Sequence, residues 1–363
     1  MNILYLINYA GKGGTERYVQ LLASHFIKEN NVHFMYNKEG PLCEKMRGMG
    51  IVPVHISMKH PLDMTAAKQI AEYCKKHSIH IVHTQFLREN YVALLSKYFM
   101  NGLKVIYTAH LHEENNHIWK YANSKMGANN DAIIAVCTWG KECLIRNKMP
   151  EDKITVIFNG ANTRIKPEFE RTADFYDKTP FSFMTVTRFT PEKGTRFLLE
   201  SSLCLRTMTK KPFRVVFIGD GPLLEADKNY VRQRGLTNYV LFTGYRKDAR
   251  DILQEAHVFV NSSRTEGLSF AILEAMALGL PLIATDQGGN RDIINDKRRC
   301  GILVPYDQPD VMAAAMLQMM DYPNLEQGLN SRKAIEEVFN IERTIKETYD
   351  IYKSIVEGES DDY

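Results

Sequence analysis

The residues best suited to chemistry are two glutamates, Glu266 and Glu274, which stand eight positions apart around a small, apolar run. If a helix begins near Ser269, Glu266 lies on the loop that leads into it and Glu274 lies inside the helix. The first amides of a helix have no partner within it and attract phosphate oxygens. This arrangement suits a phosphorylated, hydroxyl-rich ligand, although glutamates at this spacing also occur on solvated helices.

Two neighbouring loops carry further polar residues at equivalent ends of predicted strands. Arg188 and Lys193 lie in residues 187–194, which follow the strand-like run FSFMTV and precede a helical pattern. Gly288 and Gly289 follow the apolar strand PLIAT, and paired glycines let a backbone approach a ligand closely. Because an open parallel sheet binds ligands beyond the carboxyl ends of its strands, the three loops predict one ligand site.

The elements that must position these loops form two series of alternating strands and helices. Such alternation produces parallel sheets covered by helices on both faces. Strands of the first series are expected near residues 2–8, 32–36, 51–56, 79–84, 103–108, 131–136 and 154–158. Strands of the second series are expected near residues 181–187, 214–219, 239–243, 257–260, 281–285 and 302–304.

Length and composition fit a two-domain enzyme. The chain of 363 residues exceeds what one hydrophobic core normally supports. No apolar run approaches the roughly 20 residues of a membrane-spanning helix. Six cysteines are scattered without a Cys-x-x-Cys pair, which fits a reduced cytoplasm and favours neither a disulfide framework nor a zinc site.

At this point the chain resembles a known family, the retaining, nucleotide-sugar-dependent glycosyltransferases of family 4. The resemblance covers nearly the whole length. The motifs that carry it are Gly13-Gly14-Thr15-Glu16, Thr108-Ala109-His110, Ala135-Val136, Asn159-Gly160, residues 188–194, Gly219-Asp220-Gly221-Pro222, Gly244, residues 266–274 and Gly288-Gly289.

The resemblance implies the α/β architecture named GT-B, with two Rossmann-like parallel-sheet domains facing a central cleft. We expect an acceptor-side domain over residues 1–165, a linker over 166–180 and a nucleotide-sugar-binding domain over 181–340. The linker region is polar, contains prolines and lacks apolar periodicity. Residues 341–363 are expected to form a helix that crosses back to the first domain, followed by a frayed acidic tail.

The resemblance also implies the roles of individual residues. Glu266 would contact the donor sugar, Glu274 the ribose hydroxyls and His110 a donor-sugar hydroxyl. The implied catalytic residues are Glu266, His110, Arg188 and Lys193. The implied donor- and nucleotide-binding residues are Gly13, Gly14, Arg188, Lys193, Gly219, Tyr245, Arg246, Glu266, Gly267, Leu268, Ser269, Phe270 and Glu274. Glu266 could act as a covalent nucleophile or could assist a same-face mechanism, and the sequence leaves both open.

The leaving nucleoside diphosphate carries negative charge that the site must stabilise. A metal ion held by an Asp-x-Asp motif is one solution, but the sequence contains no such motif. Arg188 and Lys193 are the alternative, a rigid fork and a flexible point charge on one loop. We therefore expect no metal and no cofactor, although Arg188 could instead form only a surface salt bridge.

Some residues depart from the family pattern. Asn162 stands where the linker usually has an aspartate, Cys137 where a serine is common, and Asp292 where a glutamate often follows the two glycines. The shorter side chain of Asp292 puts its contact with a substrate in doubt.

The implied activity is transfer of a sugar, with retention, from a nucleoside-diphosphate sugar (a UDP-sugar first) to a glycan, lipid-linked or small-molecule acceptor. Bacterial cell-surface polysaccharide or glycoconjugate synthesis is the expected setting. A nucleotide-sugar epimerase with the GT-B fold is one alternative, and a catalytically silent glycosyltransferase-like binding protein is another.

The two halves of the chain differ in charge. Residues 1–170 hold 21 Lys and Arg against 15 Asp and Glu, whereas residues 171–363 hold 25 against 28. The basic first half, with Lys68, Lys75 and Lys76 in one helical pattern and Lys120 and Lys125 beside Trp119 and Tyr121 in another, could contact an anionic membrane or acceptor. Ordinary solvated helices would have the same composition. The small net charge argues against nucleic acid, and the expected location is the cytoplasm or the inner face of the cell membrane.

Overall fold

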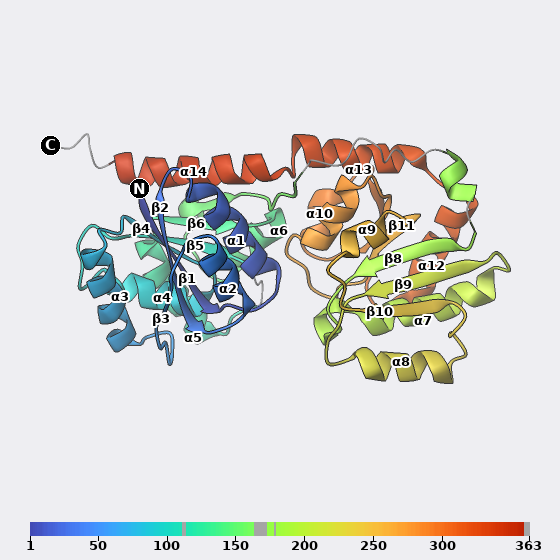
Figure 1. Cartoon of the computed structure of the whole chain (residues 1–363), viewed down its shortest axis with the longest axis horizontal. Helices are drawn as coiled ribbons and strands as arrows, with labels where there is room; N and C mark the ends of the chain where they lie inside the picture. Colours follow the sequence, from blue (N-terminus) through green and yellow to red (C-terminus); the bar gives the residue numbers. More distant parts are fainter. Residues whose placement is uncertain (111–113, 163–172, 178, 359–363) are drawn as a thin grey trace. The chain divides into compact units, whose positions relative to one another are not determined.

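The computed structural model describes residues 1–110, 114–162, 173–177 and 179–358, and the chain divides into two compact units (Figure 1). The first unit comprises Met1–Phe158 and the chain from Glu342 onward, and the second comprises Asn159–Ile341. Of the expected linker, residues 166–172 and 178 lie outside the described residues. Of the described linker residues, Ala173–Asp177 form a short 3-10 helix, η3, in the second unit. The expected frayed tail, residues 359–363, also lies outside the described residues.

The first unit is built on a parallel sheet of seven strands in the order β3-β2-β1-β4-β5-β6-β7. Buried parallel strands are nearly unbroken apolar runs, as in NILYLINY, because both faces of the sheet are covered. The strands are β1 (Asn2–Tyr9), β2 (Asn31–Lys38), β3 (Pro53–His55), β4 (Ile81–Thr84), β5 (Lys104–Ala109), β6 (Ala132–Ala135) and β7 (Ile154–Val156).

Helices cover both faces of this sheet, and alternate residues of β1 show which helix lies where. Leu4 and Leu6 pack in a core with residues of α3 and α4, while Tyr5 points to the opposite face and reaches Tyr352 of α14. The helices are α1 (Gly14–Phe26), α2 (Pro41–Gly48), α3 (Met64–Lys76), α4 (Leu87–Ser96), α5 (His117–Met126), η1 (Gly127–Asn129), α6 (Thr138–Arg146), η2 (Glu151–Lys153) and α14 (Ile341–Glu357).

The second unit repeats the plan with a parallel sheet of six strands in the order β10-β9-β8-β11-β12-β13. The strands are β8 (Phe181–Val186), β9 (Phe213–Ile218), β10 (Val240–Gly244), β11 (Val258–Asn261), β12 (Leu282–Thr285) and β13 (Gly301–Val304). The helices are η4 (Pro191–Lys193), α7 (Thr195–Met208), α8 (Leu224–Gln233), α9 (Ala249–Leu253), α10 (Phe270–Ala277), α11 (Asn290–Ile293), α12 (Pro309–Asp321) and α13 (Leu325–Glu337).

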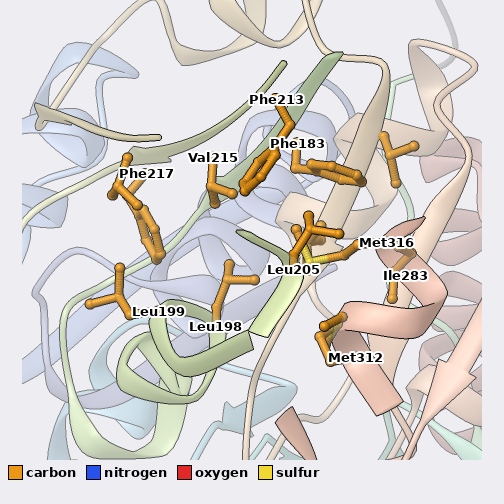
Figure 2. Close-up of a cluster of buried hydrophobic side chains, with 14 of the residues drawn as sticks. Phe183, Leu198, Leu199, Leu205, Phe213, Val215, Phe217, Ile283, Met312 and Met316 are labelled. Carbon is orange, nitrogen blue, oxygen red and sulfur yellow. The ribbon is translucent and has the colours of Figure 1, made fainter. Parts of the chain in front are cut away.

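One face of the second sheet holds a dense core (Figure 2). Phe183 of β8 and Phe217 of β9 belong to this core together with Leu198 of α7, and Met312 and Met316 of α12 lie on the side nearer Ile283 of β12. Unbranched methionines adapt to the irregular gap that the flat aromatic rings leave. This core fixes α7, and with it the preceding loop, against the end of β8.

The expected pair of Rossmann-like parallel sheets is confirmed, and every expected strand lies within two residues of its expected bounds. β3 is shorter than the expected 51–56, since it forms an edge strand that pairs only with β2. In the part of the chain that the structure describes, no helix is both long and apolar enough to cross a bilayer.

Candidate active site

Both sheets reverse their strand order at a comparable place, between β1 and β4 in the first unit and between β8 and β11 in the second. Loops diverge on either side of such a reversal, which leaves a crevice beyond the carboxyl ends of the two strands. In the second unit these are the loops 187–194 after β8 and 262–269 after β11. Both loops carry predicted site residues, so this edge of the sheet is the candidate active site.

The loop after β8 is pressed against the end of β11. Gly194 has a left-handed backbone, with φ of +59°, and a Cβ there would lie 2.0 Å from the carbonyl oxygen of Ser262. Only glycine fits this position without displacing the backbone. The hydroxyl of Ser262 donates to the carbonyl of Lys193 at 3.1 Å, and the amide of Arg264 donates to the carbonyl of Glu192 at 2.8 Å. The two loops therefore behave as one backbone assembly.

This assembly brings Lys193 and Glu266 into direct contact. The Lys193 ammonium lies 2.8 Å from Oε2 of Glu266, and the hydroxyl of Ser263 donates to the same oxygen at 2.8 Å. The Glu266 side chain is only 10% exposed and that of Lys193 only 19%. A carboxylate so deeply placed is stabilised by its cation and hydroxyl partners. Lys193 and Glu266 were predicted to share a site, and they are in contact although they lie 73 positions apart in sequence.

Arg188 has a different environment from Lys193. Its guanidinium lies 3.3 Å from the Glu192 carboxylate, and its side chain is 58% exposed. Exposed pairs of this kind contribute about 1 kcal/mol or less to stability. Arg188 can therefore exchange Glu192 for another anion at little cost, while it stands on the same loop as Lys193.

The helix expected to begin near Ser269 is α10, with Ser269 as its N-cap and Phe270 as its first residue. The Ser269 side chain makes no capping hydrogen bond. Glu274 lies in the helix and is partly exposed. The amide of Gly289, from the loop after β12, donates to the carbonyl of Gly267 at 3.0 Å. Loop 286–290 therefore braces the start of α10.

Packing within the second unit requires glycine at position 219, independently of any ligand. Its φ is +144°, and a Cβ there would lie 1.8 Å from the carbonyl oxygen of Thr187. Beyond β10, Tyr245 is 59% exposed, and the Arg246 guanidinium pairs with Asp248 at 2.5 Å. Gly219 thus stands on the loop after β9, and Tyr245 and Arg246 stand on the loop after β10.

The first unit holds the remaining predicted residues. Gly13 has an extended backbone and precedes Gly14, the first residue of α1, on the loop after β1. His110 follows the last residue of β5 and is half-buried. Its Nε2 lies 3.0 Å from Oε1 of Gln85, and its ring packs edge-on against Tyr18 of α1 with centroids 5.0 Å apart. His110 is therefore held from both sides at the carboxyl edge of the sheet.

Two family models match this architecture. Residues 12–165 match the model described as Glycosyltransferase Family 4, and residues 180–322 match the one described as Glycosyl transferases group 1. The chain belongs to the GT-B glycosyltransferases. The expected resemblance is thereby confirmed at the level of the family.

Relatives of this glycosyltransferase cover nearly its whole length. The UDP-Gal:alpha-D-GlcNAc-diphosphoundecaprenol alpha-1,3-galactosyltransferase of Escherichia coli is 26% identical over 347 residues, which is 90% of this chain and 89% of that one. A glycosyltransferase from Rickettsia africae superposes with a TM-score of 0.82 at 22% identity, covering 98% of both chains. Anabaena Alr3699/HepE, solved in complex with UDP, gives 0.83 at 16% identity, covering 98% of this chain and 100% of that one. At these identities the solved structures establish the fold alone.

Asn159 is a buried residue of this glycosyltransferase whose contact the sequence did not predict. Its side-chain amide donates to the carbonyl of Leu268 at 3.0 Å, just before α10. Its Oδ1 has no hydrogen-bond partner within the described ranges. The Asn159-Gly160 dipeptide is one of the motifs that carry the family resemblance, yet nothing in the sequence indicated that Asn159 braces the loop that carries Glu266.

A second unpredicted group is a hydrogen-bonded chain beneath His110. Nδ1 of His83 lies 2.5 Å from the Tyr352 hydroxyl, and its Nε2 lies 2.6 Å from the Thr108 hydroxyl. Thr108 in turn lies 3.4 Å from the hydroxyl of Tyr18. Burial lowers the pKa of the His83 imidazole to about 3, so it is neutral at physiological pH. His83 lies inside an otherwise apolar strand, so the sequence did not indicate that it belongs to a polar network.

Glu89 is the third unpredicted group, at the reversal point of the first sheet. It is fully buried in the first turn of α4, and its Oε1 accepts a hydrogen bond from the amide of Asn8 at 3.1 Å. Its Oε2 has no partner among the residues that the structure describes. Burial raises the pKa of this carboxyl to about 8. In the sequence LRENYV a glutamate is typical of a solvated helix start, which hides its burial.

Proposed function

We propose that this glycosyltransferase moves a sugar from a nucleoside-diphosphate donor, a UDP-sugar first, to a glycan, lipid-linked or small-molecule acceptor. We propose further that the anomeric configuration is retained and that no metal or cofactor is needed, in bacterial cell-surface polysaccharide or glycoconjugate synthesis. The contact between Lys193 and Glu266 at the strand reversal of the second unit carries this proposal. It joins a cation suited to phosphate with a carboxylate suited to a sugar.

The names of related proteins support the choice of donor and acceptor. The Escherichia coli relative is named for UDP-Gal and a diphosphoundecaprenol acceptor, and Anabaena HepE was solved with UDP-glucose. UDP and a lipid-linked acceptor are therefore the first compounds to test.

Lys193 would stabilise the charge that grows on the departing diphosphate. An ammonium has three donors, so Lys193 can hold Glu266 with one and offer others to phosphate oxygens. Arg188 would add a second cation by exchanging Glu192 for phosphate. Neutralising a leaving group in this way stabilises the transition state more than the ground state.

The two glutamates would divide the donor between them. Glu266 would contact the sugar, orient its ring and stabilise positive charge at the anomeric carbon. Glu274, in α10, would accept hydrogen bonds from the ribose hydroxyls. The backbone amides of Gly267 and of Leu268 to Phe270, at the start of α10, would donate hydrogen bonds to phosphate oxygens. In the second unit, Gly219, Tyr245 and Arg246 are the remaining residues proposed to bind the donor. In the first unit, Gly13 and Gly14 are proposed to bind the donor, and His110 would bind a hydroxyl of the transferred sugar.

The first experiment is ligand-dependent thermal unfolding with UDP, GDP and ADP. A ligand at about 100 times its dissociation constant adds roughly 2.7 kcal/mol to the free energy of unfolding. Stabilisation by UDP followed by transfer of the UDP-sugar to a lipid-diphosphate acceptor would support the proposal, with NMR of the product giving the anomeric configuration. Transfer should persist in EDTA. Formation of an epimer without acceptor would favour the epimerase, and no response to any nucleotide would favour the binding protein.

We also propose that the first unit contacts an anionic membrane surface at the inner face of the cell membrane. On α5, Ile118 is 77% exposed and Tyr121 is 67% exposed, and the Lys125 ammonium lies 5.9 Å from the Tyr121 ring centre. Apolar and aromatic side chains beside exposed cations are typical of peripheral membrane contacts. Trp119 is less exposed than Ile118 and Tyr121, because its ring stacks on Tyr91 with ring centroids 5.8 Å apart and packs against the core.

Vesicle co-sedimentation tests the membrane contact. Lys120 pairs with Glu114 at 2.6 Å, so the informative charge reversals are at Lys75, Lys76 and Lys125, whose side chains are exposed. Binding should rise with the anionic lipid fraction, fall with salt, and weaken by about 1 kcal/mol for each lysine changed to glutamate. Lys210→Glu, on an exposed residue of the second unit, is the control. Binding that ignores lipid charge would leave a soluble acceptor as the better account.

A further inference from the structure

The two carboxylate oxygens of Glu266 have different surroundings. Oε2 accepts hydrogen bonds from the Lys193 ammonium at 2.8 Å and from the Ser263 hydroxyl at 2.8 Å. Oε1 makes no hydrogen bond and no ion pair with the described part of the chain, and this oxygen is not fully buried. Each oxygen of a carboxylate has about two lone-pair sites. The two donors therefore occupy Oε2 and leave Oε1 open.

Buried side chains fix the backbone of Ser263. Its amide donates to Oδ1 of Asn261 at 3.3 Å, and its carbonyl accepts from the hydroxyl of Thr285 at 2.6 Å. The side-chain amide of Asn290 donates to the same Oδ1 at 3.3 Å and to the Thr285 carbonyl at 2.9 Å. These four residues are each 7% exposed or less. The end of β11 and the loop after β12 thus hold the Ser263 hydroxyl in place.

The Ser263 hydroxyl gives the carboxylate a defined orientation. The last torsion of a glutamate side chain has a broad energy minimum, so one partner does not fix it. Lys193 is a point charge on a flexible stem, and either oxygen of Glu266 can approach it. The hydroxyl is a second donor on a fixed backbone, and only one orientation of the carboxylate satisfies both donors. Ser263 therefore distinguishes two oxygens that are chemically identical.

We propose that Ser263 is a positioning residue which, with Lys193, retains Oε2 of Glu266 and leaves Oε1 as the oxygen that meets the donor sugar. The inference rests on the proposed function, in which Glu266 contacts that sugar. A single oriented oxygen presents its negative charge in one direction, toward a sugar hydroxyl or the anomeric carbon. Ser263 acts only through Glu266 in this arrangement.

Crystal structures of the full chain test the orientation without ligand and without turnover. In the wild type, one oxygen of Glu266 should contact both Lys193 and Ser263, and the other should face solvent. In Ser263→Ala the carboxylate should turn, so that both oxygens share the Lys193 ammonium. An unmoved carboxylate in Ser263→Ala, or a second oxygen held by another protein group in the wild type, would overturn the proposal. This readout holds even if the protein transfers no sugar.

Kinetics with UDP-galactose and UDP-glucose, and a lipid-diphosphate acceptor, connects the orientation to transfer. Ser263→Ala should lower kcat about 10-fold or more with little change in the donor KM, because the proposed ribose and diphosphate contacts are intact. Its affinity for free UDP, measured by titration calorimetry, should equal that of the wild type. Failure of the wild type to bind UDP would contradict the proposed function. Normal UDP binding with an unchanged kcat in Ser263→Ala would instead contradict the role of Ser263.

Two further variants separate positioning from a loss of stability. Ser263→Thr keeps the hydroxyl and should recover most of the kcat that Ser263→Ala loses. Ser201→Ala is the matched control, because it removes a buried serine hydroxyl of the same unit, which donates to the carbonyl of Phe197 within α7 at 2.8 Å. It should lower the melting temperature about as much as Ser263→Ala and leave kcat unchanged. Equal losses of kcat in the two alanine variants, or a stably folded Ser263→Thr without recovery, would refute the positioning role.

Discussion

Glu89→Gln should make the first unit more stable at alkaline pH. The carboxyl of Glu89 is fully buried, with one oxygen accepting from Asn8 and the other without a partner among the described residues. Burial raises its pKa from 4.5 to about 8, so the folded protein holds this group protonated at neutral pH while the unfolded chain releases the proton. Glutamine has the shape of the protonated acid and never ionises.

The sign and size of the effect follow from proton linkage. A raised pKa in the fold means that the contribution of Glu89 to stability is fully present below pH 4.5 and is lost as the pH rises toward 8. Each pKa unit corresponds to about 1.4 kcal/mol, so the loss approaches at most about 5 kcal/mol above pH 8 and about 3 kcal/mol at pH 7. The variant should exceed the wild type by about 1 kcal/mol or less at pH 5, and by increasing amounts at pH 7 and 9.

Urea unfolding at these three pH values measures the effect, with fluorescence and circular dichroism followed together. Glu72→Gln is the matched control, because Glu72 lies on α3 with its side chain 64% exposed, 4.0 Å from Lys68. The control should differ from the wild type by about 0.5 kcal/mol or less at every pH. A constant difference between Glu89→Gln and wild type from pH 5 to 9 would refute the reasoning, since Glu89 would then be ionised in the fold.

Five further variants test the second unit and one helix cap. Lys193→Ala and Arg188→Ala should each lower kcat about 100-fold or more, measured as initial rates of transfer, and near-normal rates in both would remove the cationic clamp. Glu274→Gln should chiefly weaken binding of the free nucleoside diphosphate, measured by titration calorimetry, whereas Glu266→Gln should chiefly lower kcat. Equal losses of nucleotide affinity in the two variants would contradict the division of roles. Cys137→Ser should stabilise α6 by about 0.5 kcal/mol, because Cys137 is the N-cap of α6 and its sulfur accepts a hydrogen bond from the amide of Gly140 at 3.3 Å. Thermal unfolding measures the effect, and a lower melting temperature in the variant would contradict this role for residue 137.

The strands and the site loops were predictable because their signals are local. Buried parallel strands such as β8 are short apolar runs, and the polar residues that follow them fall at the carboxyl edge whatever the rest of the chain does. Glu266 and Lys193 could therefore be assigned to neighbouring loops. Their direct contact depends on how Gly194 seats one loop on the other, which no local pattern records.

The unpredicted residues share a different property, which is burial of a polar group by distant parts of the chain. Glu89 and Gln85 look like ordinary residues at a solvated helix start, and only the packing of α4 against β1 and β5 buries them. The ring of Trp119 likewise packs against a distant part of the chain, because it stacks on Tyr91 of α4.

The hydrogen bond between Tyr352 and His83 has a consequence for how the protein is made. The first unit consists of two pieces of chain, and everything from Asn159 to Ile341 is synthesised between them. Tyr352 fills its place beside Tyr5 and His83 only after the second unit has left the ribosome. Until then the polar core of the first unit stays open, and a chain cut short before Tyr352 would expose it to chaperones and proteases. The domain that is begun first is therefore the one that is completed last.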